Sequence, residues 1–277
     1  MSANDGWITV HVRPGSHREA ATAAMFDAGA QGLQELGDLL ITHVPDQATA
    51  DAVLCAVLAA SSDATVETAP LANVDWSEAW KSGIRAQHLG ALTIAPPWLA
   101  DGLDPATTIV IEPAMAFGTG EHETTRGVVR LMQKVIRSGD HVADLGAGSA
   151  VLAIAAAKLG AAEVAAIEID PDAIGNAEEN VARNGVADRV KVIQGDAATL
   201  LPLVAPVRVV FANIISSVLL ALLDTIVAAV AADGRMILSG ILIAERDQMV
   251  LAVEERGWRI EAEDAEGAWW SATIARW

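Results

Sequence analysis

The chain has 277 residues, of which 52% are hydrophobic and 19% charged. This composition supplies a large buried core and excludes disordered, collagen-like and coiled-coil proteins. With 36 acidic and 18 basic residues the formal net charge is −18, which argues against direct nucleic-acid binding and suits either a basic protein partner or simple solubility. The single cysteine, Cys55, excludes an internal disulfide, and no signal-peptide pattern opens the chain, so a cytoplasmic location is expected. The protein is also expected to be a monomer.

Residues 1–70 are expected to form a small domain of their own. The Gly37-Asp38 pair predicts a turn between two strands, and Asp46 is a candidate cap for the helix that follows it. The order strand, helix, strand, strand, helix, strand is typical of a ferredoxin-like α+β fold. The domain holds nine acids and two bases, which favours a recognition module over a second active site. The expected elements are residues 7–12, 16–28, 32–36, 39–44, 48–60 and 64–68.

Residues 71–100 are interpreted as a linking segment. It contains a short predicted helix, 75–83, with Trp76 and Trp80 four residues apart on one face. That pair is expected to pack between domains in preference to binding a ligand. The Pro96-Pro97 pair closes the segment.

Residues 101–277 alternate between strand-like and helix-like runs, which predicts a doubly wound α/β domain with a mostly parallel sheet. The apolar run 209–232 resembles a membrane span, but Asn213 and Asp224 interrupt it, so a buried strand and a core helix are expected and no membrane association. The predicted strands are 142–145, 164–169, 190–193, 207–212, 236–239 and 269–274, and the predicted helices are 126–136, 151–159, 171–184, 217–232 and 244–256.

A glycine-rich turn follows the first of these strands, with the pattern Asp144-x-Gly146-x-Gly148-x-Ala150. Ligands in such sheets bind beyond the carboxyl ends of the strands, where small residues allow close approach of the backbone. A dinucleotide fingerprint would need glycine where Val151 stands, and the Gly-Lys-Ser/Thr of a phosphate-binding loop is absent. Glu168 ends the next strand, where a carboxylate can accept two hydrogen bonds from a ribose diol.

This pattern resembles the first motif of the class I S-adenosylmethionine-dependent methyltransferases, with alanine at the usual third glycine. The resemblance implies that Asp144, Gly146 and Gly148 form the cofactor loop and that Glu168 binds the adenosine ribose. Asp196 would lie beside the adenine, unless it only stabilises its turn, and Asp170 is favoured as a helix cap.

Asn213 closes the fourth strand, within Asn213-Ile-Ile-Ser. A buried asparagine needs hydrogen-bond partners, and related amine methyltransferases use an asparagine here to accept from the target amine. The resemblance therefore implies a catalytic and cofactor-adjacent role for Asn213; capping of the next helix is the alternative.

The segment Glu112-Pro-Ala-Met-Ala-Phe117-Gly118-Thr-Gly-Glu-His-Glu-Thr-Thr125 is read on its own as a loop capped by Thr124 or Thr125. With the Trp76, Asn213 and Trp269 segments it resembles the PrmA-type methyltransferases of bacteria, which modify large-subunit ribosomal protein eleven. That resemblance implies that Phe117, Gly118 and Thr125 enclose S-adenosylmethionine. It also implies that the acidic small domain grips the basic ribosomal protein, whose lysine or N-terminal amines are methylated.

Three other interpretations stay open. The chain could be a related methyltransferase that acts on another protein or a small amine. It could also be a non-catalytic module that holds the cofactor, or a nicotinamide-dependent oxidoreductase. No metal site is expected, because the six histidines lack ligand spacing. His122 is the nearest candidate base, although a structural role is favoured for it, and Glu121 receives no role.

Overall fold

The computed structural model describes residues 7–71, 84–113 and 120–277. The chain divides into two compact units, Met1–Gly83 and Ile84–Trp277. Residues 84–100, expected in the linking segment, therefore belong to the second unit. The predicted helix 75–83, with Trp76 and Trp80, lies outside the described residues.

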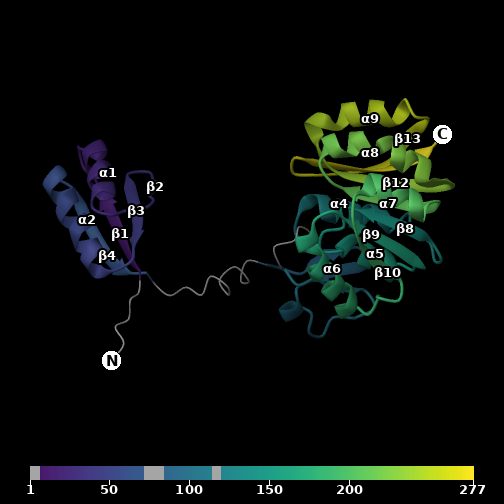
Figure 1. Ribbon diagram of the computed structural model, residues 1–277, viewed down its shortest axis with the longest axis horizontal. Helices are drawn as coiled ribbons and strands as arrows, with labels where there is room; N and C mark the ends of the chain where they lie inside the picture. The colour runs from purple at the N-terminus through teal and green to yellow at the C-terminus, as the bar shows by residue number, and fades with distance from the viewer. Residues whose placement is uncertain (1–6, 72–83, 114–119) are drawn as a thin grey trace. The chain divides into compact units, whose positions relative to one another are not determined.

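The first unit is the predicted ferredoxin-like domain. Its four strands pair in the order β2-β3-β1-β4, and every pairing is antiparallel. Helices α1 and α2 lie side by side against the sheet (Figure 1). The elements are β1 (Ile8–Arg13), α1 (Arg18–Asp27), β2 (Gln34–Leu36), β3 (Leu39–Val44), α2 (Gln47–Ala60) and β4 (Thr65–Pro70).

Alternation along β1 explains this packing. Val10 and Val12 are fully buried with Leu40 of β3 and Val53 of α2, because residues two apart on a strand share one face. The predicted cap of α2 is confirmed, since a carboxylate oxygen of Asp46 accepts a hydrogen bond from the Thr49 amide at 2.8 Å.

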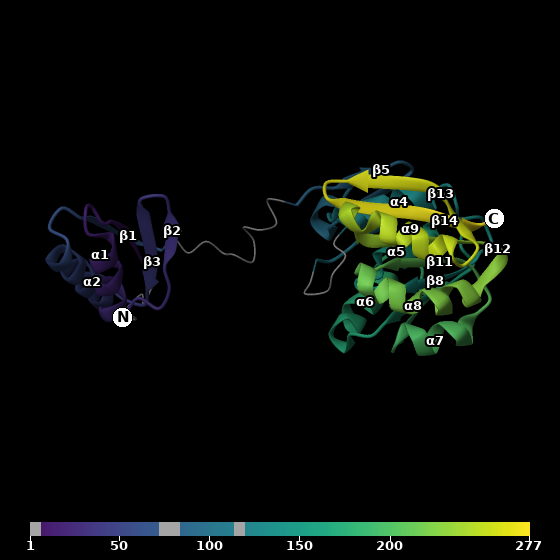
Figure 2. The same ribbon diagram turned by 90° about the horizontal axis from the view of Figure 1, so that it is seen from above.

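The second unit is the predicted doubly wound α/β domain. A seven-stranded sheet runs in the order β10-β9-β8-β11-β12-β14-β13. Its strands are parallel except β14, which pairs antiparallel with β12 and with β13; Figure 2 shows the β13–β14 hairpin. Its elements are β8 (His141–Leu145), α5 (Val151–Lys158), β9 (Glu163–Glu168), α6 (Pro171–Arg183), β10 (Val190–Gln194), α7 (Ala197–Val204), β11 (Val207–Asn213), α8 (Ser216–Ala229), β12 (Val230–Leu242), η3 (Ile243–Glu245), α9 (Arg246–Glu254), β13 (Trp258–Glu266) and β14 (Trp269–Arg276).

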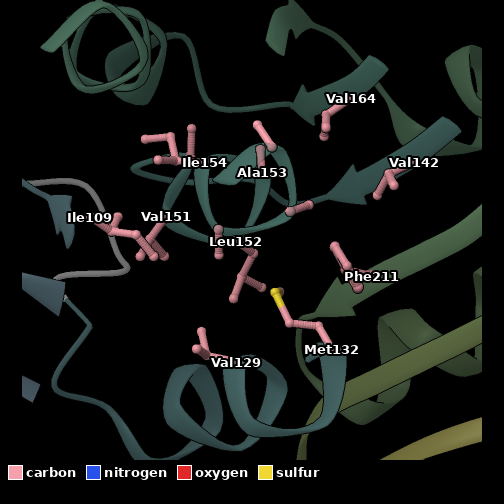
Figure 3. Packing of buried hydrophobic residues seen from close by; sticks show 14 of the residues in the cluster. Ile109, Val129, Met132, Val142, Val151, Leu152, Ala153, Ile154, Val164 and Phe211 are labelled. Atoms are coloured by element: carbon pink, nitrogen blue, oxygen red, sulfur yellow. The ribbon is translucent and has the colours of Figure 1, made fainter. Parts of the chain in front are cut away.

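Two layers of helices cover this sheet. Helix α4 (Glu123–Met132) packs with α5 and α6 on one face, where Val129, Met132, Leu152 and Phe211 meet (Figure 3). Helices α7, α8 and α9 cover the other face over Leu145 and its neighbours. The central strands β8, β9 and β11 are largely buried on both faces and read as continuous apolar runs, as parallel strands do.

A smaller sheet precedes these elements in the chain. It consists of β5 (Gln87–Leu89), β6 (Leu92–Ala95) and β7 (Thr108–Val110), with the short helix η2 (Pro97–Leu99) between β6 and β7. Ile94 and Ile109 of this sheet join the core around α4 and α5.

The apolar run 209–232 divides between β11, α8 and the start of β12, as expected apart from the end of the helix at Ala229. In the described ranges of the chain, no helix has both the length and the apolar character needed to span a membrane.

Sheet order fixes where a ligand can bind. Strands β9 and β10 extend to one side of β8, and β11 and β12 extend to the other. The winding therefore reverses between β8 and β11, and open α/β sheets bind ligands beyond the carboxyl ends of the strands at this point. Those two strands end at Leu145, followed by Gly146, and at Asn213.

Candidate active site

A cavity of about 490 Å³ lies at this reversal point. On the β8 and β9 side its wall includes Gly146, Gly148 and Glu168. On the β11, β12 and β14 side the wall includes Asn213 and Trp269. The sequence had placed four of these five residues at the site. Trp269 is the addition, although it belongs to a segment that carried the family resemblance.

The turn after β8 needs the glycines that the motif supplies. Gly146 and Gly148 have φ of +70° and +52°, a region that side chains other than glycine rarely adopt. A Cβ on Gly146 would also stand 2.5 Å from the Cγ2 atom of Ile214. Ala150, which replaces the usual third glycine, has φ +64° and is fully buried, so the motif's backbone shape persists despite the methyl group.

Glu168 is held in place by two backbone amides. Its Oε2 atom accepts from Gly148 N at 2.7 Å, and its Oε1 atom accepts from Asp170 N at 2.9 Å. Each carboxylate oxygen can accept a second bond, so the residue can still take the two hydroxyls of a ribose. Glu168 is only 7% exposed, and it is one of the residues that line the cavity.

Asp144 lies beneath the turn and does not line the cavity. Its Oδ2 atom accepts from Ala153 N at 3.0 Å at the start of α5, while Oδ1 is buried without a hydrogen-bond partner among the described residues. Burial raises the pKa of Asp144 to about 7, opposed by the Ala153 bond and assisted by the negative charge of Glu168. Its hydrogen bond is with the first turn of α5, so any influence on a ligand would act through the position of that helix.

Asn213 lies at the end of β11 beside α4. Its Nδ2 atom approaches Thr125 Oγ1 at 3.5 Å, the outer limit of a hydrogen bond, and Thr125 is fully buried. With the amide nitrogen turned toward Thr125, Oδ1 is the atom left to accept from a ligand. The alternative role as a helix cap is not observed, because Ile215 occupies the N-cap of α8 without a side-chain bond.

His122 is the N-cap of α4, which begins at Glu123, three residues before the predicted helix start. Its Nδ1 atom lies 2.8 Å from Thr124 Oγ1 and accepts from Thr124 N at 3.3 Å, so the expected cap by Thr124 or Thr125 is wrong. The imidazole ring also contacts Trp269 edge-on, with centroids 5.2 Å apart. The Nδ1 atom is thus committed to the helix, as the structural interpretation of His122 expected.

Trp269 is positioned by ion pairs between α4 and the β13–β14 hairpin. Arg126 Nη2 lies 2.6 Å from Glu266 Oε1, and Arg130 Nη2 lies 2.5 Å from Asp264 Oδ1. The hydrogen bond with Arg126 lowers the pKa of Glu266, and a second bond, from Arg130 Nη2 to Glu266 Oε2 at 2.7 Å, adds to this effect. The helix that presents Thr125 and the hairpin that presents Trp269 are therefore fastened together.

Asp196 and Asp170 do not line the cavity. Asp196 caps α7 by accepting from Ala198 N at 3.1 Å, which is the turn role considered for it, and Asp170 caps α6 as favoured. Phe117 and Gly118 lie outside the described residues. Across the described ranges, no group of three or more histidine, cysteine or acidic side chains could hold a metal ion.

The cavity lies where the winding of the sheet reverses, beside a Gly-x-Gly turn and a carboxylate at the end of the next strand, and one strand, β14, runs against the others. Together these features define the class I methyltransferase fold. A family model described as "Ribosomal protein L11 methyltransferase (PrmA)" matches residues 15–276. The chain belongs to this family and is a methyltransferase.

Individual similar proteins carry the same description as the family. A ribosomal protein L11 methyltransferase of Pelotomaculum thermopropionicum is 39% identical over 220 residues, covering 79% of this chain and 70% of the relative. One from an Exiguobacterium species is 38% identical, covering 78% and 68%. The crystal structure of a ribosomal protein L11 methylase from Lactobacillus delbrueckii subsp. bulgaricus has 30% identity and a TM-score of 0.63, covering 70% of this chain and 99% of that one.

Proposed function

We propose that this protein transfers methyl groups from S-adenosylmethionine to lysine side-chain or N-terminal amines of ribosomal protein L11. The observation that carries the proposal is the pairing of a donor wall and an acceptor wall across one cavity. Gly146, Gly148 and Glu168 stand on one side, and Asn213 and Trp269 on the other.

The donor wall suits the adenosine part of S-adenosylmethionine. Glu168 can accept from the ribose diol, and the absence of side chains at Gly146 and Gly148 lets the turn approach a ligand closely. When bound, the donor supplies an activated methyl group on a sulfonium centre. The protein then mainly has to hold the acceptor in line with that group and exclude water.

The acceptor wall suits an amine. Asn213 Oδ1 can accept one amine hydrogen, which turns the nitrogen lone pair away from the asparagine and toward the donor wall. Ile214 and Val218 supply apolar surface on the same side of the cavity. Apolar surroundings disfavour an ammonium ion, so they help a lysine to enter as the neutral amine that attack requires.

Proton removal is assigned to solvent. The Nδ1 atom of His122 is bonded within the start of α4, and the acids at the site serve the loop and the ribose position. We infer that the amine loses its proton to water as it enters the cavity, so that the methyl step itself needs no side-chain base.

The first domain, residues 1–70, is assigned to recognition of the substrate, and residues 71–100 to the connection. Exposed acids such as Asp38, Glu35 and Asp51 complement a basic ribosomal protein. The second candidate, transfer to another protein or a small amine, is favoured by no observed feature.

The test is methyl transfer from labelled S-adenosylmethionine to ribosomal proteins purified from cells that lack the enzyme. Label on L11 alone supports the proposal, and label on another protein or only on free amines contradicts the assigned substrate. Calorimetry with S-adenosylhomocysteine and with NAD tests the donor separately. Binding of NAD in place of S-adenosylhomocysteine would contradict the assigned cofactor.

A further inference from the structure

A second cavity lies at the other end of the large sheet. It has a volume of about 350 Å³ and opens where the chain leaves α4 and where β11 begins. Its wall also includes residues of β12, β13 and β14. Arg208 in this wall and Asn213 at the active site are near opposite ends of β11, about 17 Å apart at the rise of a strand. The two cavities are therefore separate sites.

The wall of this cavity is basic. Four of its nine residues are cations, Lys134, Arg137, Arg208 and Arg235, and Glu261 is its single acid. This concentration stands out in a chain that has only 18 basic residues and a net charge of −18. A local excess of positive charge in an acidic protein marks a place where an anion is stabilised.

Two of the four cations are matched by carboxylates. Arg235 forms a bidentate pair with Glu261, with nitrogen–oxygen distances of 2.6 and 2.9 Å. Arg208 Nε lies 2.5 Å from Asp140 Oδ1, and Arg208 Nη2 donates to the Val135 carbonyl. These pairs fix the two guanidinium groups as rigid parts of the wall.

The other two cations are available to a ligand. Arg137 reaches Asp233 only at 3.5 Å, and both side chains are more than 60% exposed, so solvent screens that pair. Lys134 forms no ion pair within the described part of the chain. The cavity therefore offers a ligand two positive charges, one of them only weakly paired with Asp233.

Thr273 gives an independent sign of a missing partner. The residue lines the cavity from β14, is 2% exposed, and its hydroxyl has no hydrogen-bond partner among the described residues. Buried hydroxyls are almost always bonded, because a hydroxyl removed from water without a new partner destabilises the fold. The register of β13 against β14 shifts between Ile260 and Ala262, beside this position, and such bulges often adjoin binding sites.

We propose that this cavity binds the phosphate dianion of a small molecule, either inorganic phosphate or a phosphate monoester. A dianion matches these two positive charges, and its oxygens can accept from Lys134, Arg137 and the Thr273 hydroxyl. The volume suits a small ligand. A long polyanion is disfavoured because the rest of this acidic chain repels it.

The test is isothermal calorimetry of the full-length protein with sodium phosphate at low ionic strength. Saturable binding of one phosphate per chain is expected. The double variant Lys134→Gln/Arg137→Gln should bind about tenfold more weakly or worse, since it loses two charge-assisted bonds. Lys158→Gln/Lys191→Gln removes the same charge elsewhere in the unit and should bind like the parent protein.

A variant with an unchanged net charge distinguishes binding at this site from nonspecific electrostatic attraction of anions. Thr273→Val keeps the shape of the side chain and should weaken phosphate binding several-fold with an unchanged Tm or a higher one. Acetate, a monoanion, should bind far more weakly than phosphate. Glycerol 3-phosphate, a monoester without the adenosine group that the active site is proposed to bind, identifies the source: tighter binding than phosphate assigns a monoester, and weaker binding assigns inorganic phosphate.

Three results would overturn the proposal. They are the absence of saturable phosphate binding, equal affinity in the Lys134→Gln/Arg137→Gln variant and the parent protein, and equal affinity for acetate and phosphate. Because the readout is binding at the far end of β11, these results do not depend on whether the protein methylates L11.

Discussion

The Gly148 amide donates to Glu168 Oε2 at 2.7 Å, which joins the glycine turn after β8 to the carboxylate that ends β9. One side chain thus performs two tasks: it holds the turn in shape, and it offers its remaining acceptor positions to the cavity. A substitution at Glu168 is therefore expected to disturb both the loop and the ribose position.

Glu168→Gln should weaken S-adenosylhomocysteine binding by about tenfold or more. The variant loses a charged acceptor, and the new side-chain NH2 group faces a backbone N–H that is itself a donor. Calorimetry measures the loss. Glu163→Gln, at the exposed start of the same strand, is the matched control and should bind normally. Equal affinity of Glu168→Gln and the parent protein would remove Glu168 from the donor site.

Asn213→Ala should lower kcat by about 100-fold while the affinity for S-adenosylhomocysteine changes less than a few-fold, because the lost group orients the acceptor. Steady-state methylation and calorimetry give the two values. If turnover is unchanged, Asn213 has no catalytic role. If donor binding and turnover fall together, its role is in the cofactor site instead.

Gly146→Ala should abolish donor binding and destabilise the second unit by about 1–3 kcal/mol, since the methyl group meets Ile214 and the backbone is left-handed. Gly185→Ala is the control, with φ +65° and no atom within 4 Å of the added carbon. It should show the strain of the left-handed residue alone. Denaturant unfolding of both variants separates the clash from the strain.

Asp144 should make stability fall as the pH rises from about 4 to about 7. Its folded-state pKa of about 7 exceeds the ordinary 3.8, so the folded protein binds the extra proton in this range and loses that advantage at higher pH. Asp144→Asn should therefore gain stability relative to the parent protein between pH 5 and pH 8, by about 1 kcal/mol or more.

Urea unfolding at the two pH values measures this change. Asp188→Asn, at an exposed position, should shift by the same amount at both pH values. A parent protein that is relatively more stable at pH 8 than Asp144→Asn would show that Asp144 is ionised and supported by its surroundings.

The architecture followed from sequence where the apolar pattern was strong. The buried strands that end at Leu145, Glu168 and Asn213 were located within one or two residues, because parallel strands covered on both faces give continuous apolar runs. Strand β13 was missed although the residues after Trp258 alternate regularly between exposed and half-buried positions as far as Glu266. Its many acidic residues concealed a two-residue period that would have identified it.

The site was only partly predictable. Glycine spacing and strand-end acids indicate a ligand crevice because they satisfy local backbone requirements, and so Gly146 and Glu168 could be found in the sequence. The contacts between His122 and Trp269, and between Arg126 and Glu266, join segments about 140 residues apart. No local pattern encodes such pairs. The same holds for the basic cavity, whose four cations come from three separate stretches of chain.

The most direct test of the account is the intact mass of purified ribosomal protein L11 after incubation with this protein and S-adenosylmethionine. We expect L11 to gain mass in whole methyl increments with the parent protein and almost none with Asn213→Ala at equal donor occupancy. An L11 mass that stays unchanged while S-adenosylmethionine is demonstrably bound would contradict the proposed substrate.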